Sequence, residues 1–175
     1  MHIILGLLAT AAAIIYYLTQ ISKGAGHVVD AANELSNMPR KLRYRKKAGK
    51  SGLDLVETPV EAATVLMISV ARLDKLGRVS DEQARTIANE LVDHMQLDRS
   101  YADDLIINMR SLSRYLTQPE STLFPMVSVL QGAISKEDAL GLAEMMTRVA
   151  NVDGHINSGQ EDVIRRFKDR MGLLG

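Results

Sequence analysis

Several residue types are missing from this chain, and each absence removes a class of chemistry. The 175 residues include no cysteine, so disulfides, cysteine-ligated zinc, iron–sulfur centres and thiol nucleophiles are excluded. The four histidines (His2, His27, His94 and His155) are scattered, with no pair at metal-binding spacing. No glycine-rich phosphate loop, nucleophile elbow or HExxH motif occurs either. We therefore expect a protein that is not an enzyme.

Charge is also missing from the first 22 residues, and the segment Ile3–Leu18 is almost wholly apolar. A helix of this length spans about 30 Å, the thickness of a bilayer's hydrocarbon core. The main alternative is a cleavable signal peptide, because small-x-small triplets lie within residues 9–13. That alternative lacks a basic start, and the apolar run continues past the alanines. A buried helix of a soluble protein is a third interpretation. We predict a retained transmembrane anchor over residues 1–22.

Small residues lie along one face of this predicted anchor. Gly6, Ala9 and Ala13 are separated by three and then four positions, which places them on the same side of a helix. Small side chains allow the backbones of two transmembrane helices to approach closely. The pattern predicts contact with an integral membrane partner, although alanine is also common in such helices without any contact.

A basic cluster follows the apolar segment. Residues 1–50 hold eight basic and two acidic side chains, a net charge of +6, and residues 51–175 hold thirteen and nineteen, a net charge of −6. Seven of the basic residues fall between positions 40 and 50: Arg40, Lys41, Arg43, Arg45, Lys46, Lys47 and Lys50. The positive-inside rule then places the amino terminus outside a bacterial inner membrane and the rest in the cytoplasm.

The same cluster predicts contact with anionic membrane lipid across a linker at residues 23–52. Binding to nucleic acid is the weaker interpretation, because only Tyr44 is present in the cluster for base stacking. We expect no nucleic-acid partner.

Residues 53–175 show helical apolar spacing and no convincing strand alternation, so we predict an all-α bundle of five or six short helices. Capping residues predict where the helices begin. The expected ranges are 59–73, 80–95, 100–116, a short helix within 123–133 interrupted early by Pro125, 135–149 and 157–171. In the third of these, Asp103 and Asp104 are expected in the first turn.

Two stretches of this region resemble each other. Each has a helix, a turn with an aspartate, a glycine able to take positive φ, an inward β-branched residue and a capped second helix. The turn residues are Asp74 and Gly77 in the first stretch and Asp153 and Gly154 in the second. The pattern predicts a duplicated helical hairpin.

With its Ala-x-x-Asp-Gly-x-Ile/Val-x motif, complete over residues 150–157, the chain resembles the TerB-like family of small helical domains. In layout, with an anchor and a basic segment ahead of the domain, it is similar to membrane-anchored DnaJ-like co-chaperones, but it contains no His-Pro-Asp tripeptide. The resemblance implies that acids near the turns bind divalent ions, with Asp74, Asp153 and Glu161 at the matching positions. The alternative is that each aspartate accepts hydrogen bonds from amides of its own turn.

Two functions from different classes follow. The first is a membrane-anchored interaction module or accessory subunit of a membrane protein complex, with no cofactor and with a cytoplasmic protein partner. The second is a metal-responsive protein of tellurite or envelope stress that binds divalent ions at the Asp-Gly turns.

Overall fold

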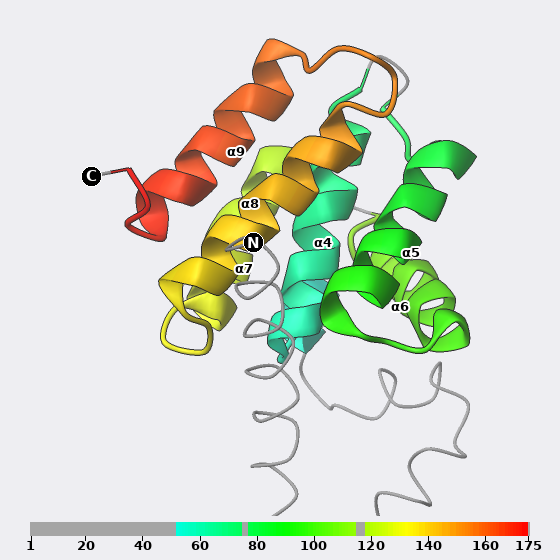
Figure 1. The fold of residues 1–175 in the computed structure, drawn as a ribbon, viewed down its shortest axis with the longest axis horizontal. Helices are drawn as coiled ribbons and strands as arrows, with labels where there is room; N and C mark the ends of the chain where they lie inside the picture. Colours follow the sequence, from blue (N-terminus) through cyan, green and yellow to red (C-terminus); the bar gives the residue numbers. More distant parts are fainter. Residues whose placement is uncertain (1–51, 75–76, 115–117, 175) are drawn as a thin grey trace, which may run out of the picture.

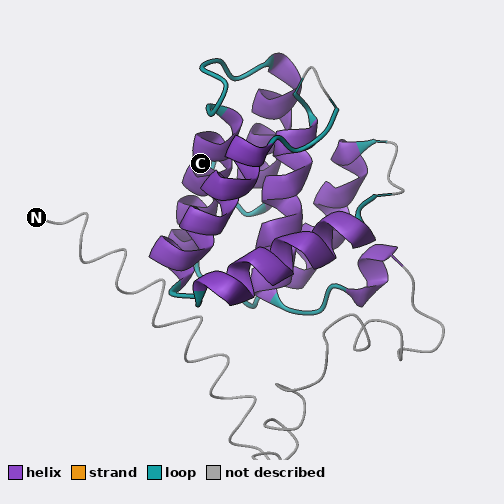
Figure 2. Ribbon diagram, turned by 90° about the vertical axis from the view of Figure 1, so that its right-hand side faces the viewer, coloured by secondary structure: helices purple, strands orange, loops and turns teal. Residues whose placement is uncertain are grey.

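The computed structural model describes residues 52–74, 77–114 and 118–174, and within these ranges all regular structure is helical (Figures 1 and 2). The elements are η1 (Gly52–Leu55), α4 (Pro59–Arg72), α5 (Asp81–Met95), α6 (Arg99–Leu112), η2 (Pro119–Thr122), α7 (Leu123–Leu130), α8 (Lys136–Ala150) and α9 (Ser158–Arg170). The six α-helices of the described part confirm the predicted all-α bundle.

Helix α4 lies at the centre, with the other helices packed around it (Figure 1). Its sequence is apolar on every face, and the residues from Ala62 to Ala71 are all buried. Such a helix is stable only when other helices cover it on all sides. Two buried hydroxyls on α4 also find partners: Thr64 donates to the Val60 carbonyl at 2.7 Å, and the Ser69 and Thr122 hydroxyl oxygens lie 2.6 Å apart.

Capping boxes begin four of the helices where the sequence predicts them. In each, the cap side chain accepts the backbone N–H of the residue three positions later, whose own side chain accepts the cap's N–H. The pairs are Thr58 with Glu61, Ser80 with Gln83, Ser135 with Asp138 and Asn157 with Gln160. These caps satisfy N–H groups that have no partner within the helix.

The boundaries predicted for the third helix are wrong at both ends. The cap is Asp98 rather than Ser100, because the Asp98 carboxylate accepts the amides of Ser100 and Tyr101 at 2.9 and 3.3 Å. Asp103 and Asp104 therefore lie beyond the first turn, which contains no acid.

The helix α6 ends at Leu112, short of the predicted residue 116. Its cap Ser113 donates both its backbone N–H, at 3.0 Å, and its hydroxyl, at 2.8 Å, to the Met109 carbonyl. The short helix α7 lies within the range predicted for it and ends at Leu130, just before Gly132 turns the chain with φ +77°. The predicted interruption at Pro125 is wrong, because α7 runs unbroken from Leu123. Pro125 is tolerated in its first turn because the missing N–H has no helical partner there.

Among the described residues, no helix is long and apolar enough to cross a membrane. The predicted anchor and the predicted linker as far as residue 51, with Gly6, Ala9, Ala13 and the seven cations from Arg40 to Lys50, lie outside those residues.

Candidate functional site

The two Asp-Gly turns have the local geometry that the duplicated pattern predicts. Gly77 and Gly154 adopt φ of +61° and +88°, a region that glycine occupies without steric cost. The inward positions are also confirmed: Val79 is buried, and Ile156 packs against the core.

The fold brings the two turns together at one end of the bundle. Gln83, from the cap of α5, donates its side-chain amide to Asp153 Oδ2 at 3.2 Å. Gln160, from the cap of α9, donates its side-chain amide back to the first hairpin, to the Val70 carbonyl of α4 at 3.1 Å. Asn157 adds a bond to the Leu73 carbonyl at 2.9 Å. The capping residues of the second helix in each hairpin therefore also form the hydrogen bonds that join the two hairpins.

This arrangement corrects one interpretation of the turns. The carboxylate of Asp153 accepts a side-chain amide from the other hairpin, whereas the alternative proposed from sequence had it accepting amides of its own turn. Because Gln83 is fully buried, its amide needs this partner, so the aspartate joins two hairpins rather than shaping one turn.

The three residues matched to a metal site have different surroundings. Asp153 is bound to Gln83, Glu161 is exposed in the first turn of α9, and Asp74 follows the end of α4. In the part of the chain that the structure describes, no three acidic or histidine side chains form a group that could hold a metal ion. Divalent-ion binding stays a prediction.

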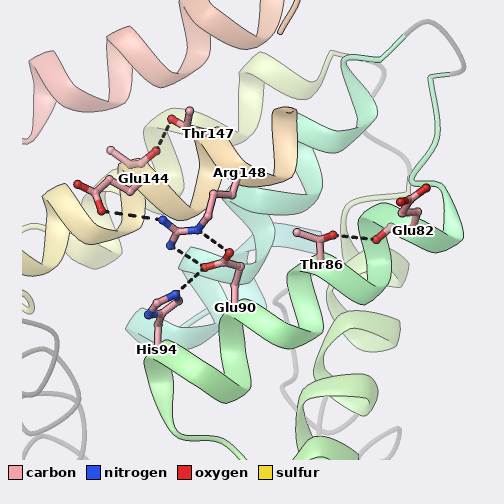
Figure 3. A network of polar contacts seen from close by, with 8 residues as sticks. Glu82, Thr86, Glu90, His94, Glu144, Thr147 and Arg148 are labelled. Carbon is pink, nitrogen blue, oxygen red and sulfur yellow. Dashed lines mark hydrogen bonds and ion pairs between the residues drawn. The ribbon is translucent and has the colours of Figure 1, made fainter. Parts of the chain in front are cut away.

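A second polar cluster, which sequence reasoning missed, joins α5 to α8 (Figure 3). Arg148 donates two hydrogen bonds to the carboxylate of Glu90, from Nε to Oε1 at 2.6 Å and from Nη2 to Oε2 at 2.7 Å. His94 Nε2 lies 3.2 Å from Glu90 Oε2, and Glu144 lies 3.9 Å from Arg148. The Glu90 side chain is only 8% exposed, so its charge is compensated within the protein rather than by water.

The hydrogen bond to Glu90 raises the pKa of Arg148 above its ordinary value, against the opposing effect of burial. A two-bond arginine–carboxylate pair fixes both the distance and the orientation of the helices that carry it. The sequence holds one signal for this pair. Glu90 is three residues after Ile87 and seven after Gln83, on the buried stripe of α5, so its carboxylate required a cation from another helix.

The sequence contains two pairs of neighbouring acids, Asp103–Asp104 and Glu161–Asp162, and one acid of each pair contacts an arginine of its own helix. Asp103 lies 3.3 Å from Arg99, and Asp162 lies 2.6 Å from Arg166 and also pairs with Arg165. Adjacent helix residues diverge, so neither Asp103–Asp104 nor Glu161–Asp162 presents two acids to one point.

Two capped hairpins, α4–α5 and α8–α9, are joined through their turns and define the described residues as part of a small all-α domain. The family model described as tellurite resistance protein TerB matches residues 60–174, which is more than half of the chain. The chain belongs to the TerB family. Comparisons with curated proteins and with solved structures gave no match.

Proposed function

We propose that this chain is a membrane-anchored, non-enzymatic docking protein and an accessory subunit of a membrane protein complex. Residues 1–22 are the anchor and residues 23–52 the linker. The TerB domain lies on the cytoplasmic side of a bacterial inner membrane, where it binds a protein of the same complex.

The observation that carries this proposal is a group of exposed apolar side chains at one end of a charged domain. We call this the α7–α9 end: α7, the first two turns of α8 and the residues that follow α9. Phe124, Leu140 and Leu174 are 57%, 47% and 53% exposed there. Water contact with large apolar side chains is unfavourable by about 25 cal/mol per Å². A protein partner that covered them would recover this free energy.

Contacts place these elements side by side. Arg170 stacks its guanidinium over the Phe124 ring, 3.5 Å from the ring centre, and its carbonyl accepts the side-chain amide of Gln131 at 3.2 Å. Gly172 lies beside Lys136, since a Cβ on this glycine would be 3.9 Å from Lys136 Nζ. Leu140 is one turn beyond Lys136 on α8. Aromatic residues and arginine are the types enriched at the centres of protein interfaces.

The membrane part of the proposal is supported by the sequence. The uncharged first 22 residues are long enough to span, and the seven cations after them predict a cytoplasmic domain. The domain's own net charge of −6 would keep most of its surface away from anionic lipid. Although the layout resembles that of DnaJ-like co-chaperones, the absence of a His-Pro-Asp tripeptide gives no support to stimulation of Hsp70.

The docking surface is tested by co-purification from native membranes. The double variant Phe124→Ser and Leu140→Ser should lose a protein that the wild-type full chain retains in mild detergent. The control is Ile107→Ser on α6, because Ile107 is 58% exposed and lies outside the α7–α9 end. Equal recovery of all associated proteins with both variants would contradict this surface.

The anchor contact is tested separately. Replacing Gly6, Ala9 and Ala13 with leucine keeps the segment apolar but prevents close approach of another helix. We expect the variant to remain in the membrane and to separate from the complex in mild detergent. Unchanged co-purification would refute the contact while leaving the docking surface in place.

The name of the matching family favours a second candidate, a metal-responsive protein of tellurite or envelope stress. Its sites would be the Asp-Gly turns, with Asp74, Asp153 and Glu161 as ligands. Calorimetric titration of the full chain in detergent with calcium, zinc or manganese tests this candidate. No heat of binding at millimolar ion would end it.

A further inference from the structure

A cavity of about 210 Å³ lies where the carboxyl ends of α4 and α6 meet the loop before α5. Four arginines line it, Arg72, Arg78, Arg110 and Arg114, and its lining residues include no carboxylate. In a domain with an excess of acidic residues, four cations around one cavity are a local reversal of charge.

The arginines differ in how firmly they are held. Arg72 is half-buried and donates from Nη1 to the Ser113 carbonyl at 2.6 Å, which fixes one guanidinium at the cavity wall. Arg78, Arg110 and Arg114 are exposed, and none of them forms an ion pair with a carboxylate whose position the structure describes. Of the six described arginines of the domain outside this cavity, four pair with at least one carboxylate: Arg99, Arg148, Arg165 and Arg166.

The helix dipole explains the positions of only some of these four arginines. Cations near the carboxyl end of a helix are stabilised by its dipole, and Arg72 and Arg110 lie in the last turns of α4 and α6. Arg78, however, lies in the loop before α5, close to the start of that helix, where the dipole favours anions. Like charges repel, so an anion bound in the cavity that these arginines line would be favoured.

We propose that this cavity is an anion site that binds a phosphate group. The guanidinium group presents N–H donors in a planar fork that matches two phosphate oxygens at once. At about 210 Å³ the cavity exceeds the roughly 10–15 Å³ that one water needs, and it is smaller than the roughly 300–1,000 Å³ of pockets for drug-sized ligands. Buried Ile68 and Val79 form part of its wall.

The position of the cavity points to two sources for such a phosphate. Gly52, at the start of the domain, lies against the end of α6, since a Cβ on it would be 3.9 Å from the Leu112 carbonyl oxygen. The basic segment, residues 40–50, directly precedes it in the sequence. If the proposed anchor holds this end of the domain near the bilayer, the phosphate is that of an anionic phospholipid. A soluble phosphate monoester is the other source, and it does not depend on the anchor.

The first experiment titrates inorganic phosphate into the full chain in a neutral detergent, with arginine Nε–Hε signals followed by ¹⁵N NMR. We expect saturable shifts in the wild type, and at least a tenfold weaker apparent affinity in the double variant Arg110→Gln and Arg114→Gln. Arg165→Gln on α9 is the matched control, because it removes an exposed charge away from the cavity. Equal shifts with chloride at the same ionic strength would overturn a specific site.

The second experiment places the full chain in nanodiscs of phosphatidylcholine, with or without phosphatidylglycerol. The absence of native cysteine allows one dye at Ser111→Cys beside the cavity, and at Glu161→Cys on α9 as a control. A fluorescence change at position 111 that requires phosphatidylglycerol and is lost in the double variant assigns the lipid source. A response to inorganic phosphate alone assigns the soluble source. The proposed site is wrong if the dye at position 111 responds to neither phosphatidylglycerol nor inorganic phosphate. It is also wrong if the dye responds equally with and without the double substitution. A wrong prediction of the transmembrane anchor would be seen separately, because the chain would then not enter the nanodiscs.

Discussion

Gly154 shows how a single backbone conformation supports the turn of the second hairpin. Its φ is +88°, and a Cβ added there would meet no heavy atom within 4 Å, so a larger residue is opposed by the backbone alone. We expect Gly154→Ala to lower the free energy of unfolding by about 1–2 kcal/mol, and Gly154→Asn to lower it less. Urea unfolding of both variants measures the difference. Equal stability of Gly154→Ala and wild type would show that the turn does not require this conformation.

Asp98 predicts a dependence of α6 on pH. Its pKa is lowered below 3.8, first by the hydrogen bond from the Ser100 hydroxyl and then by the backbone amides of Tyr101 and Ser100. A lowered folded-state pKa means that folding favours the carboxylate. The stabilisation is therefore complete above the ordinary pKa and is lost as the pH falls through the folded-state value.

The carboxyl ¹³C shift of Asp98 should titrate below its ordinary range. The variant Asp98→Ala should remove this part of the acid dependence, because no carboxylate then caps the helix. Identical acid-unfolding profiles for variant and wild type would contradict the assignment of Asp98 as the cap.

Between elements, the contact of the two hairpins makes a charge-specific prediction. Gln83→Glu keeps the acceptor for the Ser80 amide but removes the donor to Asp153 and brings two carboxylates together. We expect a loss of about 1–3 kcal/mol in the free energy of unfolding. Asp153→Asn added to this variant should restore much of it, because an amide can donate to the new glutamate. A double variant no more stable than Gln83→Glu would show that the two residues are not coupled.

The pair of Glu90 and Arg148 predicts a different response. Arg148→Met leaves a carboxylate that is only 8% exposed without its main partner, and should cost about 1–3 kcal/mol in chemical unfolding. Replacing both residues, Glu90→Leu with Arg148→Met, should recover stability, because no buried charge remains. The comparison pair is Arg99 and Asp103, 51% and 53% exposed, whose removal should cost less than about 1 kcal/mol. Similar losses at both pairs would contradict the role of burial.

The sequence predicted the elements well because their signals are local. Ser80 with Gln83 and Asn157 with Gln160 are capping boxes that can be read within four residues. The start of α6 was predicted wrongly because Asp98 and Ser100 are both good caps, and only the fold shows which carboxylate or hydroxyl receives the amides. The bond from Gln83 to Asp153 spans 70 residues, so no local pattern contained it.

At the scale of the whole molecule, the account joins a described domain to a segment known from its sequence. The packing around α4, the family membership and the exposed α7–α9 end concern residues 52–174. The transmembrane anchor, its orientation and the contact of the seven basic residues with anionic lipid stay predictions, because hydropathy and charge indicate a membrane without identifying the partner in it.

The most direct test of the docking claim is photo-crosslinking of the full chain in native membranes. A photoreactive phenylalanine analogue at position 124, within the α7–α9 end, is compared with the same analogue at position 107 on α6, where exposure is similar at 57% and 58%. The account predicts a discrete adduct of higher mass, with a membrane-complex protein, at position 124 and not at position 107. No adduct at position 124, or the same adduct at both positions, would contradict it.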